Sequence, residues 1–306
     1  MPIHITNFSR RAFLKTSLGA GASLLTFEPL QGDQSPDTPE HVALLADTHI
    51  DADPTKVVRG SVMASNLLNV VADVLAQPQQ PSLAIIDGDC AFNVGLPADY
   101  QTLSSLVTAF PAAQIPLHMA LGNHDDRPAF LKQFATDHTD ASTVEGKHVS
   151  LLKTRHVNWF LTDTLQKVNH VTGEVGAQQR DWLKAALADN RDKPAIVVGH
   201  HNPQFNVPEN GRVTGLQDTQ PLFDLLESFA HVKAYVYGHT HSWNTQQRDS
   251  GLHLINLPPV GYVFNETSPI GWVDAAVTAD RMQLTLRCID PGHPDHLTTK
   301  TLAWQL

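Results

Sequence analysis

The stretch Gly122-Asn123-His124-Asp125 directly follows the apolar run Ile115–Leu121. Four further apolar runs end in the same way, in a short cluster of glycine, aspartate or histidine. These clusters are Asp47-Thr48-His49, Asp87-Gly88-Asp89, Gly199-His200-His201 and Gly238-His239-Thr240-His241. In open α/β sheets, ligands bind beyond the carboxyl ends of the strands. We therefore expect the five clusters to meet at one site, although about 200 residues separate the first from the last.

Between the clusters the chain alternates strand-like and helical segments, which is typical of an α/β fold. Apolar residues at helical spacing predict helices over 56–76, 98–110, 176–188 and 216–229. Short apolar runs predict strands over 41–46, 83–86, 115–121, 195–198 and 232–237, and an antiparallel pair over 149–152 and 157–162. The rest is strand-like over 252–257, 272–278, 283–289 and 298–304. Residues 41–306 show no repeat or linker, so we expect one domain.

The composition excludes several classes of protein. With 42% hydrophobic and 17% charged residues in 306, the chain is globular rather than disordered. The formal charge is −10 and no basic run follows residue 15, so a nucleic-acid duplex is not an expected partner. Two cysteines, Cys90 and Cys288, are too few for a thiolate zinc site, and the sequence leaves open whether they pair.

The N-terminus carries the pattern Ser9-Arg10-Arg11-Ala12-Phe13-Leu14-Lys15 ahead of the apolar stretch 16–27. This pattern resembles a twin-arginine export signal. The apolar stretch is too short to span a bilayer, so no stable transmembrane anchor is expected. We assign residues 1–40 to a signal peptide and flexible lead-in and 41–306 to the domain. The expected partner is the twin-arginine export machinery, and the expected location is periplasmic or extracellular. The alternative is an exposed amphipathic helix.

The clusters combine carboxylate, imidazole and one amide ligand without sulfur. Such a set suits Mn, Fe, Zn or Co. Asp47 and His49 stand two residues apart, as do His239 and His241, and in extended backbone such pairs point to one face. Taken singly, each residue is as compatible with a cap, a turn or a half-buried histidine. Five clusters in order favour a metal site.

In this order the five clusters resemble those of the calcineurin-like binuclear metallophosphoesterase family, over the whole chain from residue 41. The resemblance implies an α/β fold, a four-layer α/β/β/α sandwich of two mixed sheets flanked by helices, with two divalent metal ions. It implies that Asp47, His49 and His241 bind the first metal, that Asp89 bridges both, and that Asn123, His200 and His239 bind the second. The pattern Gly173-x-x-Gly176-x-x-Gln179-x-x-Trp182-Leu183 also resembles a helix start of this family.

The activity implied by the resemblance is hydrolysis of a phosphoester by a hydroxide that bridges the metals. His124 would contact the phosphate or protonate the leaving oxygen, and Asp125 would help to orient its ring. Arg127 completes Gly-Asn-His-Asp-x-Arg, a pattern of the cyclic-nucleotide and glycerophosphodiester branch. With His201 and Asn123 it is a predicted substrate contact, although a surface arginine at a helix start fits equally.

A small-molecule phosphodiester is the favoured substrate. A broad phosphomonoesterase or nucleotidase remains open, as does a metal- or phosphoester-binding protein without turnover. Asp87 departs from the family pattern, in which a small or hydroxyl residue is expected. Its carboxylate either adds negative charge near the metals or points away, because residues alternate faces along a strand. The metal pair and the oligomeric state stay open.

Overall fold

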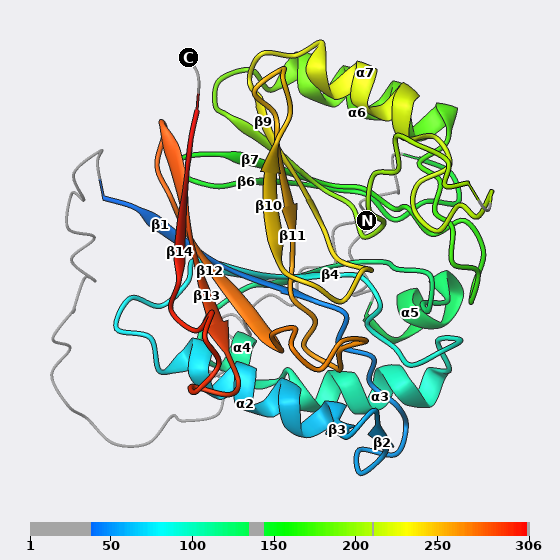
Figure 1. Ribbon diagram of the computed structural model, residues 1–306, viewed down its shortest axis with the longest axis vertical. Coiled ribbons are helices and arrows are strands. Elements are labelled where there is room, and N and C mark those ends of the chain that lie inside the picture. Colours follow the sequence, from blue (N-terminus) through cyan, green and yellow to red (C-terminus); the bar gives the residue numbers. More distant parts are fainter. Residues whose placement is uncertain (1–37, 135–143, 210, 305–306) are drawn as a thin grey trace, which may run out of the picture.

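The structure, a computed structural model, describes residues 38–134, 144–209 and 211–304. The twin-arginine pattern and most of the lead-in lie outside the described residues. Two six-stranded mixed sheets pack face to face, with helices on both outer faces (Figure 1). The predicted four-layer α/β/β/α sandwich is therefore confirmed.

The first sheet has the strand order β14-β13-β12-β1-β4-β5. Its strands are β1 (Glu40–Ala46), β4 (Leu83–Asp87), β5 (Leu117–Ala120), β12 (Gly271–Val277), β13 (Arg281–Cys288) and β14 (Thr299–Ala303). β1, β4 and β5 run parallel, so their carboxyl ends lie at one edge. The C-terminal strands β12, β13 and β14 extend this sheet by antiparallel pairing.

The second sheet has the order β10-β11-β9-β8-β7-β6. Its strands are β6 (Ser150–Lys153), β7 (Asn158–Leu161), β8 (Ala195–Val198), β9 (Val232–Tyr237), β10 (Asn244–Gln247) and β11 (His253–Asn256). β6 and β7 form the predicted antiparallel pair, and β7, β8, β9 and β11 run parallel. The carboxyl ends of β8 and β9 therefore also share one edge.

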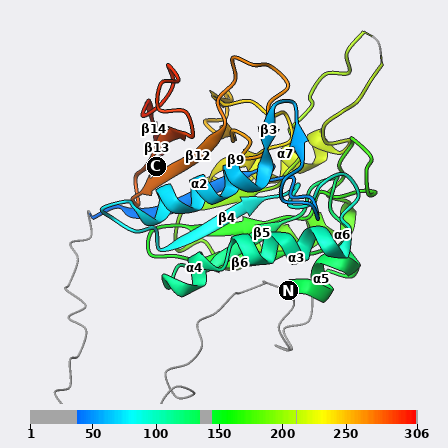
Figure 2. The same ribbon diagram turned by 90° about the horizontal axis from the view of Figure 1, so that it is seen from below.

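The helices form the two outer layers. They are α2 (Met63–Leu75), α3 (Pro97–Leu106), α4 (Ala109–Ala112) and α5 (Arg127–Phe134) on the side of the first sheet, and α6 (Ala177–Asp189) and α7 (Thr219–Glu227) on the second. Figure 2 looks onto α2, α3 and α4, with β4 and β5 next to them. Among the described residues, no helix is both long and apolar enough to cross a membrane.

Three apolar layers hold the sandwich together. The middle layer packs the two sheets against each other through alternate residues of each strand, such as Leu44 of β1 and Val236 of β9. The residues between these, such as Leu45 and Tyr235, face the helices instead. Each fully buried Val or Leu contributes about 1.5–3 kcal/mol. This packing leaves the strand ends as the place where polar side chains can gather.

Some sequence predictions of local structure are wrong. Residues 57–62 form a small hairpin of β2 (Val57–Val58) and β3 (Ser61–Val62) instead of the first turns of α2. Its turn places Arg59 and Gly60 at φ 49° and 81°, which a helix does not allow. The predicted helix 98–110 is divided into α3 and α4, and α5 was not anticipated. Cys90 and Cys288 are both free and buried, which settles the question of their pairing.

Candidate metal centre

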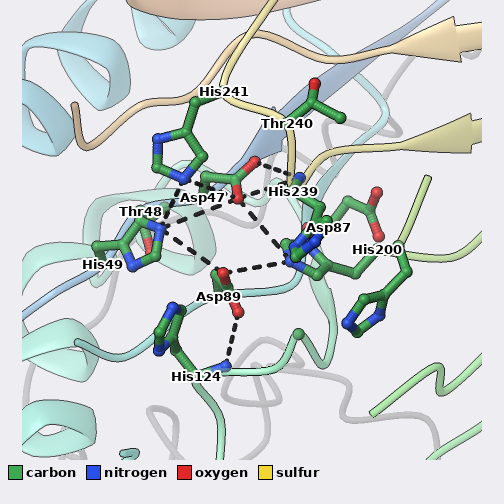
Figure 3. A network of polar contacts seen from close by, with 12 residues as sticks. Asp47, Thr48, His49, Asp87, Asp89, His124, His200, His239, Thr240 and His241 are labelled. Carbon is green, nitrogen blue, oxygen red and sulfur yellow. Dashed lines mark hydrogen bonds and ion pairs between the residues drawn. The ribbon is translucent and has the colours of Figure 1, made fainter. Parts of the chain in front are cut away.

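The carboxyl ends of five strands meet at one place, as the sequence predicts. β1, β4 and β5 of the first sheet deliver the clusters after residues 46, 87 and 120, and β8 and β9 of the second sheet deliver those after 198 and 237. Figure 3 shows Asp89 between His49 on one side and His200 on the other, with Asp47 and His241 nearby. The prediction that segments so distant in sequence converge is confirmed.

The backbone at these strand ends is unusual. Five of the predicted ligands have left-handed backbone: Asp47 (φ 52°), His49 (47°), Asp89 (46°), His239 (67°) and His241 (51°). Aspartate and histidine tolerate this region better than most residues. Gly122 and Gly238 permit close approach, because a side-chain carbon there would collide with the carboxylates of Asp89 and Asp47.

The first group of candidate ligands is Asp47, His49 and His241, whose ligand atoms lie within 4.8 Å of one another. The Nε2 atoms of His49 and His241 are 3.0 Å apart. Nε2 of His241 lies 3.4 Å from Oδ1 of Asp47. All three side chains are buried. Their donor atoms therefore point into one small volume.

The second group is Asp89, His200 and His239, again within 4.8 Å. Oδ2 of Asp89 lies 3.2 Å from Nε2 of His200 and 3.6 Å from Nε2 of His49. One oxygen atom thus contacts imidazoles of both groups, as a bridging carboxylate would. The Oδ1 atom of Asn123 is buried without a hydrogen-bond partner among the described residues, which leaves it available as a further ligand.

Backbone carbonyls fix the tautomers of three of the imidazoles. The carbonyls of Asp87, Thr214 and Tyr262 accept hydrogen bonds from Nδ1 of His200 (2.8 Å), Nε2 of His239 (2.8 Å) and Nδ1 of His241 (2.6 Å). A carbonyl only accepts, so each of these ring nitrogens carries a proton. In the neutral ring the other nitrogen then presents a lone pair. A hydrogen bond from the ring nitrogen that does not bind the metal is typical of metal-binding histidines.

The donor set fits divalent metal ions. Nε2 of His200 faces the carboxylate of Asp89 at 3.2 Å, and the lone pair on Nε2 of His241 faces Asp47 at 3.4 Å. Burial acts to lower the pKa of His200, but Asp89 and Asp47 outweigh it and raise that pKa well above the usual range. The site therefore favours a positive charge between these atoms, in the form of a proton or of a metal ion. Buried carboxylates and imidazoles satisfy this need by coordinating metals. The residues present therefore suit the metal pair that the resemblance implies.

The electrostatics of the site favour the metal-binding form of His239, His241 and Asp89, but not that of Asp47 and His200. Burial lowers the pKa of both His239 and His241 to about 4, so both rings are neutral at neutral pH. Burial also acts to raise the pKa of Asp89, but His200, His124 and His49 outweigh it and the net pKa falls well below the usual range. Burial raises the pKa of Asp47, which is mainly opposed by His200.

His124 lies beside the two groups, at the edge of the site. Its backbone N–H donates to Oδ1 of Asp89 at 2.8 Å, and its ring Nδ1 donates to the carbonyl of Asn93 at 2.7 Å. The ring of His124 also lies within ligand distance of His49 and Asp89. In this arrangement Nε2 is the ring nitrogen that is free to exchange a proton with a bound ester.

Asp125 does not orient the ring of His124, because the carbonyl of Asn93 occupies that position. Its buried carboxylate accepts hydrogen bonds from four groups instead: the N–H groups of Cys90 (3.1 Å), Ala91 (3.0 Å) and Gly122 (2.9 Å), and the hydroxyl of Tyr100 (3.0 Å). Burial raises its pKa to about 6. Asp125 thus joins the loops after β4 and β5, which carry Asp89 and Asn123.

The predicted substrate contacts of Arg127 and His201 find no support in this geometry. The guanidinium of Arg127 forms two hydrogen bonds with Asp163, at 2.6 and 2.8 Å. His201 is fully buried, and its Nδ1 bonds the hydroxyl of Thr164 at 2.7 Å. Asn123, in contrast, lies on the wall of the pocket.

A pocket of about 400 Å³ opens onto the candidate ligands. Its walls include residues that the sequence did not single out, namely Asn169, Val171, Asn202, Thr214, Thr240, Tyr262 and Phe264. Tyr262 and Phe264 both pack against the ring of His241, at 4.7 and 4.4 Å between ring centroids. They lie in the long loop after β11, several residues beyond its end, and belong to no recognised pattern, so no sequence signal marks them.

Asp87 lies at the end of β4 with its carboxylate turned away from Asp89 (Figure 3). It is fully buried, and neither carboxylate oxygen has a hydrogen-bond partner in the described part of the chain. Burial raises its pKa to about 7, Asp89 adds to the rise, and His200 opposes it. Of the two sequence alternatives, the structure favours the one in which the side chain points away from the metals.

Comparison with known proteins agrees with this geometry. A probable cyclic nucleotide phosphodiesterase of Rhodococcus erythropolis is 29% identical over 212 residues, which cover 66% of this chain and 65% of the relative. A glycerophosphodiester phosphodiesterase of Enterobacter lignolyticus is 25% identical over 238 residues, 74% of this chain and 81% of the relative. The chain thus spans just under two thirds of the first relative's length.

A similar fold occurs in the crystal structure of a dimetal phosphatase from Danio rerio, with a TM-score of 0.65 and 15% sequence identity. The match covers 88% of this chain and all of that one. The sequence model of calcineurin-like phosphoesterases matches residues 40–243, which contain all seven predicted ligands. The chain therefore belongs to the calcineurin-like phosphoesterase family.

Proposed function

We propose that this protein hydrolyses small-molecule phosphodiesters with the help of two divalent metal ions. The observation that carries the proposal is the position of Asp89, one oxygen of which contacts imidazoles of both ligand groups, at 3.2 and 3.6 Å. When bound, a pair of divalent ions in this position activates a water molecule and neutralises charge that develops on phosphorus. The names of the relatives support a phosphodiester over other esters.

The residues of the chain have distinct tasks in this reaction. Asp47, His49 and His241 would hold one ion, and His200 and His239 with Asn123 would hold the other. Asp89 would serve both groups. His124 points Nε2 towards the pocket, because Nδ1 is engaged by the carbonyl of Asn93. Once Nε2 has taken up a proton, it can donate that proton to the leaving oxygen. A well-placed acid of this kind contributes roughly 10²–10⁴-fold in rate.

The charge of the pocket favours a diester over a monoester. Among the described residues that line it, none is a lysine or an arginine. A monoester brings close to two negative charges near neutral pH, whereas a diester brings one. A pocket without cationic side chains on its walls suits the smaller charge. The monoesterase or nucleotidase alternative lacks a comparable observation.

The test compares bis-p-nitrophenyl phosphate with p-nitrophenyl phosphate on protein loaded with Mn²⁺, after metal analysis of the native sample. We expect hydrolysis of the diester, with about two ions per chain. His124→Ala should lose about 10²-fold or more in kcat and keep its metal. His231→Ala, directly before the amino end of β9 and so at the opposite end of that strand from the site, should leave both unchanged. Hydrolysis of the monoester alone would exclude the diesterase. Full metal occupancy without turnover would favour the binding protein.

We further propose that the chain leaves the cytoplasm by the twin-arginine route and acts in the periplasm or outside the cell. The support is the pattern Ser9–Lys15 ahead of a short apolar stretch, in a chain whose metal site would be assembled before transport. Replacing Arg10 and Arg11 by lysine should abolish export of the full chain in its host. Export of this variant at the level of wild type would contradict the proposal.

A further inference from the structure

One arginine near the mouth of the pocket differs from the other cations around it. The ammonium of Lys56 lies 2.6 Å from Asp51, and the guanidinium of Arg127 is bound by Asp163. Arg59 is exposed and forms no ion pair in the described structure. Its guanidinium instead lies over the ring of Phe264, with the central carbon 5.0 Å from the ring centroid. Arg59 therefore lies against Phe264 with a charge that no carboxylate of the described structure pairs with.

Phe264 connects this arginine to the metal site. The ring lines the pocket, yet 56% of the residue is exposed, which is unusual for a large apolar side chain. It stacks on the ring of His241 with centroids 4.4 Å apart and an angle of 27°. The two contacts in series hold the guanidinium within about 10 Å of the His241 ring.

The backbone also restricts the position of Arg59. The residue occupies the tight turn between β2 and β3, with φ at 49°, and Gly60 follows at 81°. Val58, directly before it, packs against the apolar layer beneath the first sheet. A two-residue turn anchored in this way limits the movement of the side chain that it presents. The guanidinium is thus displayed beside the pocket by a short hairpin, not by a long loop.

We propose that Arg59, supported by Phe264, determines specificity by binding a second anionic group of the substrate, several bonds from the phosphorus that reacts. The inference rests on the proposed function and adds a substrate class to it, that of phosphodiesters with a distal phosphate or carboxylate. Guanidinium binds such groups through two parallel hydrogen bonds. No lysine or arginine is among the described residues that line the pocket, and Arg59 reaches it only through Phe264. The chain as a whole repels anions with its charge of −10.

The test uses two esters that differ only in the distal charge. These are thymidine 5′-(p-nitrophenyl phosphate) and the same compound with an added 3′-phosphate, and both release p-nitrophenol on diester hydrolysis. Wild-type protein should show the lower KM for the compound with the 3′-phosphate. Arg59→Gln should raise that KM about tenfold with little change in kcat, and raise the KM of the other ester by a clearly smaller factor.

Matched variants separate recognition from general effects of charge and folding. Arg248→Gln removes another guanidinium that lies over a phenylalanine, at 4.0 Å from the ring centroid of Phe205, and should not alter the preference. Arg59→Lys should keep part of the preference for the ester with the 3′-phosphate, and Phe264→Leu should lose part of that preference. An equal rise in KM for both esters in Arg59→Gln, or an equal effect of Arg248→Gln, would overturn the proposal.

A binding measurement distinguishes failure of this inference from failure of the proposed function. Calorimetry of thymidine 5′-monophosphate and thymidine 3′,5′-bisphosphate with metal-loaded protein needs no turnover. Tighter binding of the bisphosphate that disappears in Arg59→Gln would support the role of Arg59 even if neither ester were hydrolysed, in which case only the proposed function would fail. Equal affinity of wild type for both nucleotides would overturn the role of Arg59 and leave phosphodiester hydrolysis intact.

Discussion

The two sheets contribute different chemistry to the same centre. The first sheet supplies both carboxylates that face the site, Asp47 and Asp89, together with the amide of Asn123. The second supplies only imidazoles, on the loops after β8 and β9. The negative charge that attracts metal ions therefore comes from one sheet, and mostly neutral ligands come from the other.

The two halves also differ in how their side chains are held. In the first sheet the loops are bound to one another, since the N–H of His49 donates to the carbonyl of Asp89 at 2.9 Å and Asp125 joins two further loops. The imidazoles of the second sheet depend on carbonyls elsewhere, such as that of Tyr262. The loops after β8 and β9 are also joined to each other, since the N–H of Gly238 donates to the carbonyl of His200 at 3.0 Å. The halves therefore differ mainly in the buried carboxylate of Asp125, which only the first half has, and in the carbonyls that orient the imidazoles of the second.

The largest expected effect comes from removing one ligand from each half. Asp89→Asn should lower kcat/KM by about 10³-fold or more, because several kcal/mol of charge stabilisation depend on it and each 1.36 kcal/mol is worth tenfold. It should also release both ions. His239→Asn removes a neutral ligand and should release one ion. Inductively coupled plasma mass spectrometry with steady-state kinetics checks both, and equal metal loss in the two variants would break the distinction between the halves.

The next effect concerns the buried anchor of the first half. Asp125→Asn turns one acceptor into a donor facing N–H groups, and should lower the free energy of unfolding by about 1.5–3 kcal/mol. Because its loops carry Asp89 and Asn123, activity should fall about 10–100-fold. Denaturant unfolding and kinetics measure the two quantities.

Asp218 offers the matched control in the second half. Its carboxylate accepts from the N–H groups of Val175 (3.0 Å) and Gly176 (2.9 Å) and pairs with Arg180, but it does not line the pocket. Asp218→Asn should therefore lose stability without a comparable loss of activity. If both variants lost activity to the same extent, the special role of Asp125 would be refuted.

The last expected effect concerns stability alone, and is a dependence of stability on pH that originates at Asp87. Its pKa rises from 3.8 when unfolded to about 7 when folded, because of burial. Between these values the folded protein retains a proton that the unfolded chain releases, so the free energy of unfolding falls as pH rises, by up to about 4 kcal/mol in all. Above pH 7 the loss is complete.

Asp87→Asn should remove this contribution, so the variant gains stability over wild type as pH increases from 4 to 7. Denaturant unfolding of both proteins, chelated and metal-free, at several pH values measures the difference in their free energies of unfolding. Titration of the other buried groups is common to both proteins and cancels in this difference. A difference between the two proteins that does not change with pH would show that Asp87 is already ionised in the fold.

The sequence predicts the fold and the convergence of the clusters for a clear physical reason. Each cluster follows a buried strand, and parallel strands of one sheet must end at the same edge. The ligand groups that lie together are those expected, down to Asp89 between His49 and His200. The position of each cluster directly after a strand was sufficient to predict the site, because the strands carry the clusters to one edge of each sheet.

The remaining features depend on contacts that spacing does not encode. The partner of Arg127 is Asp163, 36 residues away, and that of Asp125 is the set of N–H groups at the end of another strand. The pocket wall at Tyr262 and Phe264 depends on where a loop after the second sheet lies. The apolar residues of the hairpin around Arg59 have the same helical spacing as those of α2 after it. The sequence therefore predicted one continuous helix there.

The left-handed backbone of five candidate ligands has a practical consequence for anyone who needs a natively folded but catalytically silent reference protein. Alanine or valine at Asp47, His49, Asp89, His239 or His241 would remove the ligand and also add about 1–2 kcal/mol of steric cost in that conformation. Asparagine adopts it readily. An asparagine scan would therefore report on the charge and type of the ligand with little added backbone strain, whereas an alanine scan would mix loss of the ligand with misfolding.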